Sequence, residues 1–206
     1  MAAPTHDDPA PDADRQDALV DLVATTRELM LAVGRTDATA AELRRSREVL
    51  QEVTRTLAAR ARPGIVRADS DGPTLAARAG RPWTIARYNP YGLPLEVRFD
   101  EGGASAVFTA DALAEGPPGC VHGGVSAWLM DTMLGVLVQA EGVPSVTGTL
   151  DLRFLAPTPL GCELELRSRV TERAGRRTRA EGWVAHEGRR TVEAVGTFYR
   201  YERPVP

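Results

Sequence analysis

The stretch that most constrains the fold is residues 123–140, GGVSAWLMDTMLGVLVQA, which is apolar on every side of a helix. A helix of this kind is enclosed either by other protein elements or by lipid. The segment is barely long enough to span a bilayer, carries one central carboxylate, Asp131, and lies between strand-forming stretches, so a membrane span is rejected. The sequence therefore predicts a central helix wrapped by protein.

Strand patterns flank this helix. Leu95, Val97 and Phe99 alternate with charged residues, which is typical of a strand with one buried face. Further strands are predicted at residues 104–110, 145–156, 162–171, 177–186 and 191–201. The turns between the last three are tight, as in antiparallel hairpins. We therefore expect an α+β fold, in which a long central helix is wrapped by a curved antiparallel sheet.

The N-terminal part has a different organisation. Residues 1–14 are acidic and rich in Pro and Ala, which predicts a disordered tail without a targeting signal. Residues 15–62 predict a helical hairpin, expected to serve as an oligomerisation or lid element, whose second helix starts at the capping box Thr39-x-x-Glu42. Residues 63–94 are rich in Pro, Gly and Arg, which predicts a loop-rich linker or pocket rim before a domain at residues 95–206.

Composition restricts the class of partner. The 206 residues include 25 basic and 28 acidic side chains, a net charge of −3, which argues against nucleic acid or an anionic membrane as a partner. Two cysteines are too few for a disulfide scaffold or for a zinc site built from paired thiolates. We therefore expect a cytoplasmic protein without a metal site.

The candidate chemistry lies where a loop rich in Gly and Pro, residues 116–124, enters the central helix. The first amides of a helix have no internal acceptor and carry partial positive charge, so the Gly123-Gly124 start suits an oxyanion hole. Asp131 is costly on an apolar helix unless it is paired or used, which favours a catalytic base. The alternatives are a loop that needs only flexibility and a hydrogen-bonded Asp that only fixes packing.

Other polar residues near this segment have two interpretations each. His122 is either a helix cap or part of the site, and Thr147 and Thr149 are either plain strand formers or site residues on the next strand. Arg173 and Arg176 belong to a basic turn that is either a solvated hairpin tip or a phosphate clamp.

The run GPPGCVHGGVSAWLMDTMLGVL, followed by GVPSVTGTLDLRFLAPTPLG and AGRRT, resembles the hot-dog fold acyl-CoA thioesterases over residues 95–202. It is most similar to the phenylacetate-pathway type and to human thioesterase superfamily members, which share its His-Gly-Gly-x6-Asp signature. The resemblance implies that Asp131 is the catalytic carboxylate and that the Gly123 amide polarises the thioester carbonyl. It also implies that His122 lies beside that carbonyl and that Thr147 helps to position Asp131 or water.

The same resemblance implies a substrate surface. Gly124 and Thr149 are expected to contact the substrate, and the turn with Arg173, Gly175 and Arg176 is expected to contact the nucleotide end of CoA. The sequence departs from some members at Gly116, where they carry an asparagine. The first 80 residues have no counterpart in this resemblance.

Helix geometry adds an expectation about assembly. Gly123 and Asp131 are eight residues apart on one helix, so their backbones lie about 12 Å apart along its axis. One carbonyl cannot contact the Gly123 amide and also lie beside a water held by Asp131 of the same chain. We therefore expect a site that combines Gly123 of one subunit with Asp131 of another, in a homodimer or a dimer of dimers.

The leading interpretation is hydrolysis of an acyl-CoA or acyl-carrier-protein thioester to free acid and thiol, a reaction expected to need no cofactor. One alternative is an enoyl-thioester hydratase or dehydratase of the same fold. The other is a non-catalytic acyl-CoA sensor with residues 15–62 as its effector module.

Overall fold

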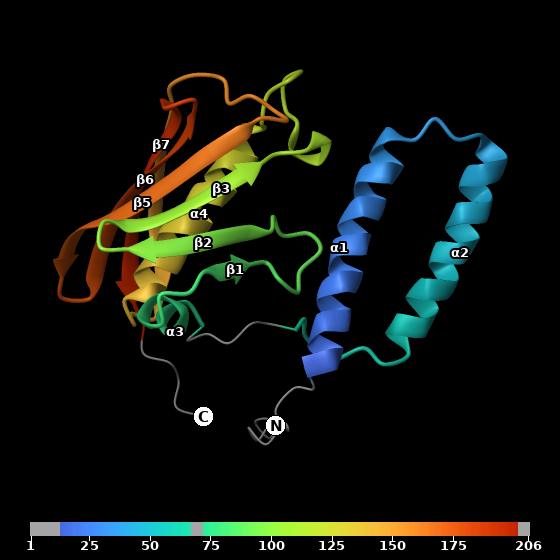
Figure 1. The fold of residues 1–206 in the computed structure, drawn as a ribbon, viewed down its shortest axis with the longest axis horizontal. Coiled ribbons are helices and arrows are strands. Elements are labelled where there is room, and N and C mark those ends of the chain that lie inside the picture. The colour runs from blue at the N-terminus through green and yellow to red at the C-terminus, as the bar shows by residue number, and fades with distance from the viewer. Residues whose placement is uncertain (1–12, 67–71, 202–206) are drawn as a thin grey trace.

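The computed structural model describes residues 13–66 and 72–201, in which a seven-stranded antiparallel sheet curves around one long helix (Figure 1). The strand order is β1-β2-β3-β5-β6-β7-β4, so β4 forms one edge of the sheet. The predicted α+β architecture, a central helix wrapped by an antiparallel sheet with an N-terminal helical hairpin, is confirmed.

Each strand forms where apolar and polar residues alternate in the sequence. The strands are β1 Trp83–Ile85, β2 Leu95–Asp100, β3 Gly103–Thr109, β4 Ser145–Phe154, β5 Glu163–Ala174, β6 Arg177–His186 and β7 Arg189–Arg200. Glu187 and Gly188 join β6 to β7, and both have left-handed φ angles, of 49° and 76°. That conformation matches the twist of the two strands and makes the hairpin tight.

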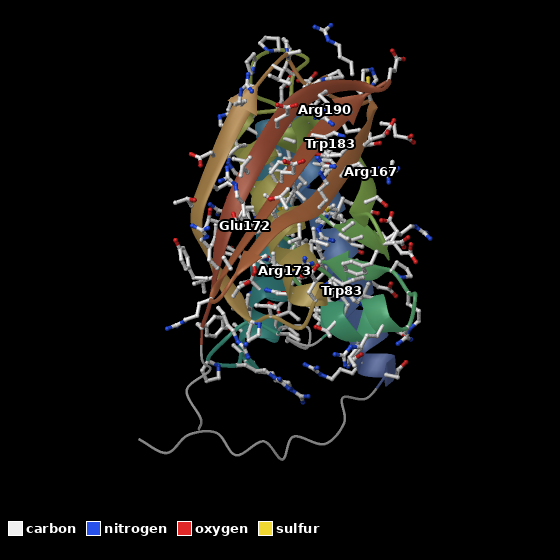
Figure 2. All side chains as sticks on the ribbon, turned by 90° about the vertical axis from the view of Figure 1, so that its left-hand side faces the viewer. Trp83, Arg167, Glu172, Arg173, Trp183 and Arg190 are labelled. Atoms are coloured by element: carbon white, nitrogen blue, oxygen red, sulfur yellow. The ribbon has the colours of Figure 1, made fainter. Side chains whose placement is uncertain are left out.

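The core lies between the concave face of the sheet and helix α4, Gly123–Ala140. The helix buries Met130, Met133, Leu134 and Val138 against strand residues such as Phe198. The opposite, outer face of the sheet is charged, as Figure 2 shows for Arg167, Glu172 and Arg190 among others. The single buried face explains the alternating pattern of the strands.

Helix α4 is less enclosed than its sequence predicts. Gly124 and Trp128 are exposed on it, and Asp131, Thr132 and Gly135 are half-buried. Within one chain the sheet curves around one side of α4 only, and these five residues define the open face of the helix. None of the helices in residues 13–66 and 72–201 is long and apolar enough to cross a membrane.

Residues 63–94, expected to be mostly loop, contain two short elements. Helix α3, Gly72–Arg78, packs beside the C-terminal half of α4, and Thr74 Oγ1 donates a hydrogen bond to the Gln139 carbonyl at 2.6 Å. Strand β1 pairs with β2. The local sequence pattern, rich in Pro and Gly, does not predict these two elements. They form because tertiary contacts stabilise them.

The N-terminal hairpin consists of α1, Ala13–Arg35, and α2, Ala40–Ala58. The predicted capping box forms, because Thr39 accepts from the Glu42 amide and the Glu42 side chain accepts from the Thr39 amide. Figure 1 shows α1 between α2 and the sheet, where it contacts the short 3-10 helix η1, Ala112–Ala114. Helix α2 has no buried residue. Residues 1–12 of the expected tail lie outside the described residues.

Candidate active site

The start of α4 leaves one backbone amide free. His122 is the N-cap of the helix, and its Nδ1 accepts a hydrogen bond from the Gly124 amide at 3.0 Å. The His122 amide itself donates to the Ala114 carbonyl at 2.8 Å. Among the described residues, the Gly123 amide has no hydrogen-bond partner. Of the two glycine amides expected to form an oxyanion hole, Gly123 is therefore the one with a free N–H group.

Gly116 explains how the loop before α4 reaches this position. Its amide donates to the Cys120 carbonyl at 2.9 Å, and a Cβ on Gly116 would lie 2.8 Å from the Cα of His122. This loop therefore has no room for a side chain at residue 116. A glycine at this position therefore has a steric reason in this chain.

Asp131 and Thr147 lie together. Thr147 Oγ1 donates a hydrogen bond to Asp131 Oδ1 at 2.9 Å, and the Asp131 side chain is half-buried on the open face of α4. The contact joins the middle of the central helix to the edge strand β4. Thr147 is therefore in direct hydrogen-bond contact with this carboxylate.

A bulge in β4 lies beside this contact. The register between β4 and β7 shifts between Thr147 and Thr149, which leaves Gly148 as the extra residue. A Cβ on Gly148 would lie 2.4 Å from the Tyr199 ring, so a glycine allows the close approach. Bulges bend a strand and redirect its side chains, often beside a functional site. Gly148 was not among the predicted site residues, although a glycine inside a strand pattern is a signal for a bulge.

Within one chain the two main candidates stay apart. Gly123 is at the start of α4 and Asp131 is eight residues later, about 12 Å along the helix axis. A Cβ on Gly123 would lie 3.4 Å from the Phe154 ring, whereas Asp131 contacts Thr147 near the other end of β4. The free amide and the carboxylate thus have different surroundings in a single chain.

The expected substrate-contacting residues differ in how free they are. The Gly124 amide is occupied by His122, and Thr149 is exposed on the edge strand opposite Thr197. In the basic turn, Gly175 has a left-handed φ of 59°. Arg173 and Arg176 both form hydrogen bonds there.

Arg173 hydrogen bonds through two guanidinium nitrogens to Glu141, just beyond the end of α4, and this contact raises the pKa of Arg173. Arg176 donates to the Arg200 carbonyl at 3.1 Å. The turn therefore lies near the C-terminal end of α4, and Figure 2 shows Arg173 at the end of the sheet away from Trp183. An incoming phosphate would have to compete with Glu141 for Arg173.

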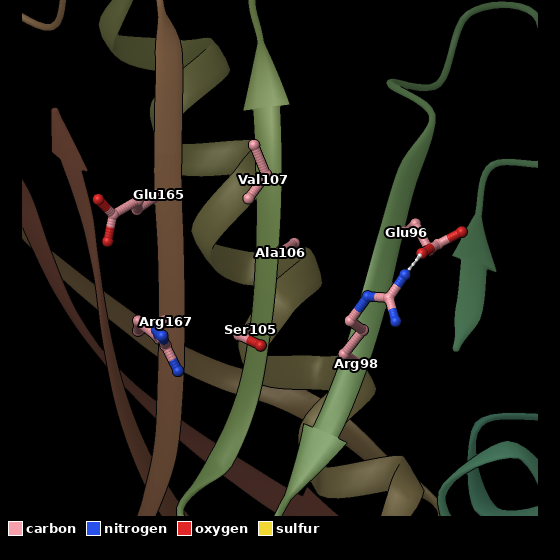
Figure 3. Close-up of a pocket in the computed structure, with 7 residues that line it drawn as sticks. All are labelled: Glu96, Arg98, Ser105, Ala106, Val107, Glu165 and Arg167. Carbon is pink, nitrogen blue, oxygen red and sulfur yellow. Dashed lines mark hydrogen bonds and ion pairs between the residues drawn. The ribbon is translucent and has the colours of Figure 1, made fainter. Parts of the chain in front are cut away.

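A depression on the outer face of the sheet is not part of this site. Figure 3 shows it between Arg98 on β2 and Arg167 on β5, where the Arg98 guanidinium donates to Glu96 at 2.6 Å. It is shallow and charged, and the sheet separates it from α4. It carries the features of a solvated sheet face.

Comparison with known proteins identifies the fold. The model of the thioesterase superfamily matches residues 118–178, a stretch that contains Gly123, Asp131 and Thr147. A crystal structure of a thioesterase superfamily protein aligns with a TM-score of 0.76 at 26% identity, over 93% of this chain and 92% of that chain. The likeness to hot-dog thioesterases that the sequence indicated is therefore confirmed, and the fold is the hot-dog fold.

The alignment with the thioesterase superfamily crystal structure also covers most of the N-terminal segment. Residues 95–206 make up little more than half of the chain, so a match over 93% of it includes most of the first 94 residues. The hairpin, for which the sequence resemblance offered no counterpart, is thus shared with a solved structure.

Two smaller structures share the fold alone. One is a hypothetical thioesterase of Streptococcus pneumoniae TIGR4 with coenzyme A, at 19% identity and a TM-score of 0.50, over 53% of this chain and 90% of that chain. The other is a Streptococcus mutans UA159 protein bound to acetyl CoA, at 18% identity and a TM-score of 0.50, with the same coverage.

Proposed function

We propose that this chain hydrolyses acyl-CoA or acyl-carrier-protein thioesters without a metal or cofactor. The observation that carries the proposal is that α4 presents both a free Gly123 amide at its start and, in its middle, the Asp131 carboxylate hydrogen bonded by Thr147. The Gly123 amide hydrogen bonds the thioester oxygen as it becomes negatively charged. Two solved structures of the same fold hold coenzyme A or acetyl CoA, which supports this substrate class.

The reaction needs one acid–base group. Acting as a base, Asp131 accepts a proton from water, whose oxygen bonds to the thioester carbon. The tetrahedral intermediate then collapses, the carbon–sulfur bond breaks, and the thiolate leaves and is protonated. Acting as a nucleophile, Asp131 bonds to the same carbon and forms an anhydride, which water hydrolyses. Both routes need the carboxylate beside a carbonyl held at Gly123.

We propose that two subunits share each site. The separation of about 12 Å between Gly123 and Asp131 along α4 keeps them from acting on one carbonyl within a chain. An antiparallel pairing of two α4 helices by their open faces brings Gly123 opposite Asp131 of the partner subunit, twice per dimer. It also covers a helix whose sequence is apolar on all sides.

The edge strand β4 supports the same assembly. It is ten residues long, has no neighbour beyond β7 in the described sheet, and exposes Val146 and Phe154. A long, apolar, unpaired edge is a template for pairing with another strand. A second copy that pairs along β4 would protect this edge and bring the two α4 helices close together.

The first test is release of free thiol from a panel of acyl-CoA substrates, followed with a thiol reagent. We expect the wild-type chain to release CoA from at least one saturated acyl-CoA in a concentration-dependent manner, with free acid as the second product. Binding of acyl-CoA without thiol release would favour the sensor, and hydration of enoyl-CoA without thiol release would favour the hydratase. Free CoA, identified as a product by mass spectrometry, distinguishes hydrolysis from the sensor and from the hydratase.

Removing the Thr147 hydroxyl should slow the reaction. Thr147→Val keeps the shape of the side chain but removes the donor to Asp131, and we expect kcat to fall by about tenfold, the scale of one hydrogen bond to a charged group. Thr147→Ser keeps the hydroxyl and is the matched control, with kcat near that of the wild type. Full kcat in a folded Thr147→Val chain would mean that this contact is only structural.

A further inference from the structure

An arginine of the N-terminal hairpin holds the loop between β1 and β2. The Arg27 guanidinium of α1 donates hydrogen bonds to the carbonyls of Ala86 and Asn89, both at 2.7 Å, and of Gly92 at 3.1 Å. Three carbonyl oxygens converge on this guanidinium, which adds side-chain donors to the backbone hydrogen bonds that the Ala86 and Asn89 carbonyls also accept. Burial lowers the pKa of Arg27, although a guanidinium stays charged. Arg27 thus supplies the donors for this loop.

The loop is strained without such support. Ala86 has a left-handed φ of 55°, and a Cβ on Gly92 would lie 2.4 Å from the Cβ of Ala86. Hydrogen bonds from Asn89 to Ala86 and from Gly92 to Asn89 form two consecutive turns. A non-glycine residue in the left-handed region persists where its surroundings hold it. The three hydrogen bonds from Arg27 are among the contacts that hold the loop in this shape.

The loop places an aromatic ring against the central helix. Tyr91 stacks on Trp128 of α4, with ring centroids 5.6 Å apart and planes at 28°. The pair is open to solvent, because Tyr91 is 76% exposed and Trp128 is 37% exposed. Trp128 lies one helical turn after Gly124 and one before Asp131, so it shares the open face of α4 with them. In one chain an exposed aromatic surface thus lies between Gly123 and Asp131, and the proposed dimer places it beside the α4 helix of the partner subunit.

In the proposed shared site, the CoA arm and the acyl group of a substrate extend in opposite directions along α4. When Gly123 faces Asp131 of the partner subunit, the two-fold axis passes near residue 127, and Trp128 is about 7.5 Å along the helix from Gly123. The basic turn lies near the C-terminal end of α4, so the CoA arm at Gly123 extends toward the turn of the partner subunit. The acyl group then extends the opposite way, toward Trp128.

We propose that Tyr91 and Trp128 form the wall that binds apolar acyl groups longer than acetyl, with Arg27 as the residue that positions it. This inference rests on the proposed thioesterase function. A two-carbon acyl group on a carbonyl at Gly123 does not reach the rings, whereas a longer chain covers them and removes apolar surface from water. The hairpin therefore acts on chain-length selectivity through the loop.

The test compares hexanoyl-CoA with acetyl-CoA. We expect Tyr91→Ala and Arg27→Met each to lower the ratio of kcat/KM for hexanoyl-CoA over acetyl-CoA by about tenfold, mainly through KM. The double variant should lower the ratio no further than Tyr91→Ala alone, because Arg27 acts through Tyr91. Arg87→Met is the matched control: Arg87 joins the same loop to Asp17 of α1 through an exposed ion pair of 3.5 Å, and its loss should leave the ratio unchanged.

Sedimentation and thermal melting must show that each variant is folded and has the wild-type oligomeric state. An unchanged ratio in folded Tyr91→Ala overturns the wall. Additive losses in the double variant overturn the positioning role of Arg27. If a variant dissociates into monomers and loses kcat/KM equally for hexanoyl-CoA and acetyl-CoA, the wall is also overturned. The two rings are then a contact between subunits.

A binding measurement separates this inference from the proposed function. If the wild type hydrolyses no acyl-CoA, the proposed function fails. The wall then stands only if hexanoyl-CoA binds more tightly than free CoA by calorimetry and Tyr91→Ala removes the difference. It is overturned if the two ligands bind equally or not at all.

Discussion

Replacing Asp131 by asparagine is expected to lower kcat for thioester hydrolysis by about 10² or more, with little change in substrate binding. The loss has the scale of removing a general base, because an amide neither accepts the proton from water nor attacks the thioester carbon. The fold should be retained, since asparagine has the same shape and its carbonyl oxygen still accepts the hydrogen bond from Thr147. Only the proton-accepting or nucleophilic capacity of the side chain is lost.

This result is read from steady-state kinetics beside a thermal melt. Asp37→Asn is the matched control, because Asp37 is an exposed carboxylate in the loop between α1 and α2, and kcat should stay within about twofold of the wild type. Near-wild-type turnover in a well-folded Asp131→Asn chain would remove Asp131 from the mechanism. Acyl-CoA binding without turnover in the wild type would point to the sensor instead.

Two inactive variants are expected to restore activity when they form hybrid dimers. One parent is Asp131→Asn. The other is Gly123→Val, whose added side chain lies where the carbonyl must approach the amide and meets the Phe154 ring, at 3.4 Å from a Cβ. If each site takes Gly123 from one subunit and Asp131 from the other, a hybrid has one site with both lesions and one with neither. Random reassortment makes about half of the dimers hybrid, so activity should recover to about a quarter of wild type.

The parents are mixed in mild denaturant, refolded together and assayed, and each parent refolded alone is the control. Mass spectrometry of the intact assembly measures the fraction of hybrids. A mixture that contains hybrids but stays as inactive as its parents contradicts the shared site. Both groups would then have to act on one carbonyl within a chain, although about 12 Å of helix separates them.

The local pattern was enough to predict most of the sheet and the helices. Leu95, Val97 and Phe99 alternate with charged residues, and β2 forms there because one face of a strand is buried and the other is solvated. The Thr39 capping box forms from four consecutive positions, so it needs no distant contact. Helix α3 and strand β1 were not predicted, because packing against α4 and pairing with β2 stabilise them rather than their own composition.

In the candidate site, too, the residue types could be predicted from the sequence, whereas their geometry could not. Two of its residues can be identified from the sequence because each is unusual in its local setting: Gly123 at a helix start and Asp131 on an apolar helix. Which glycine amide is free depended on the direction of the His122 ring, which caps Gly124. The orientation of Thr147 toward Asp131 came with a bulge at Gly148, whose register follows from pairing with β7.

By itself the sequence determined the central helix, the alternating strands, the tight hairpins and the chemical groups at the start and middle of α4. The tertiary structure alone decided which face of α4 stays open, that Tyr91 lies on Trp128, and that Arg27 binds carbonyls up to 65 residues away in the chain. The physical reason is the distance along the sequence between the residues that interact. Periodicity, caps and turns act between residues a few positions apart, whereas these contacts join segments whose encounter depends on the packing of the whole domain.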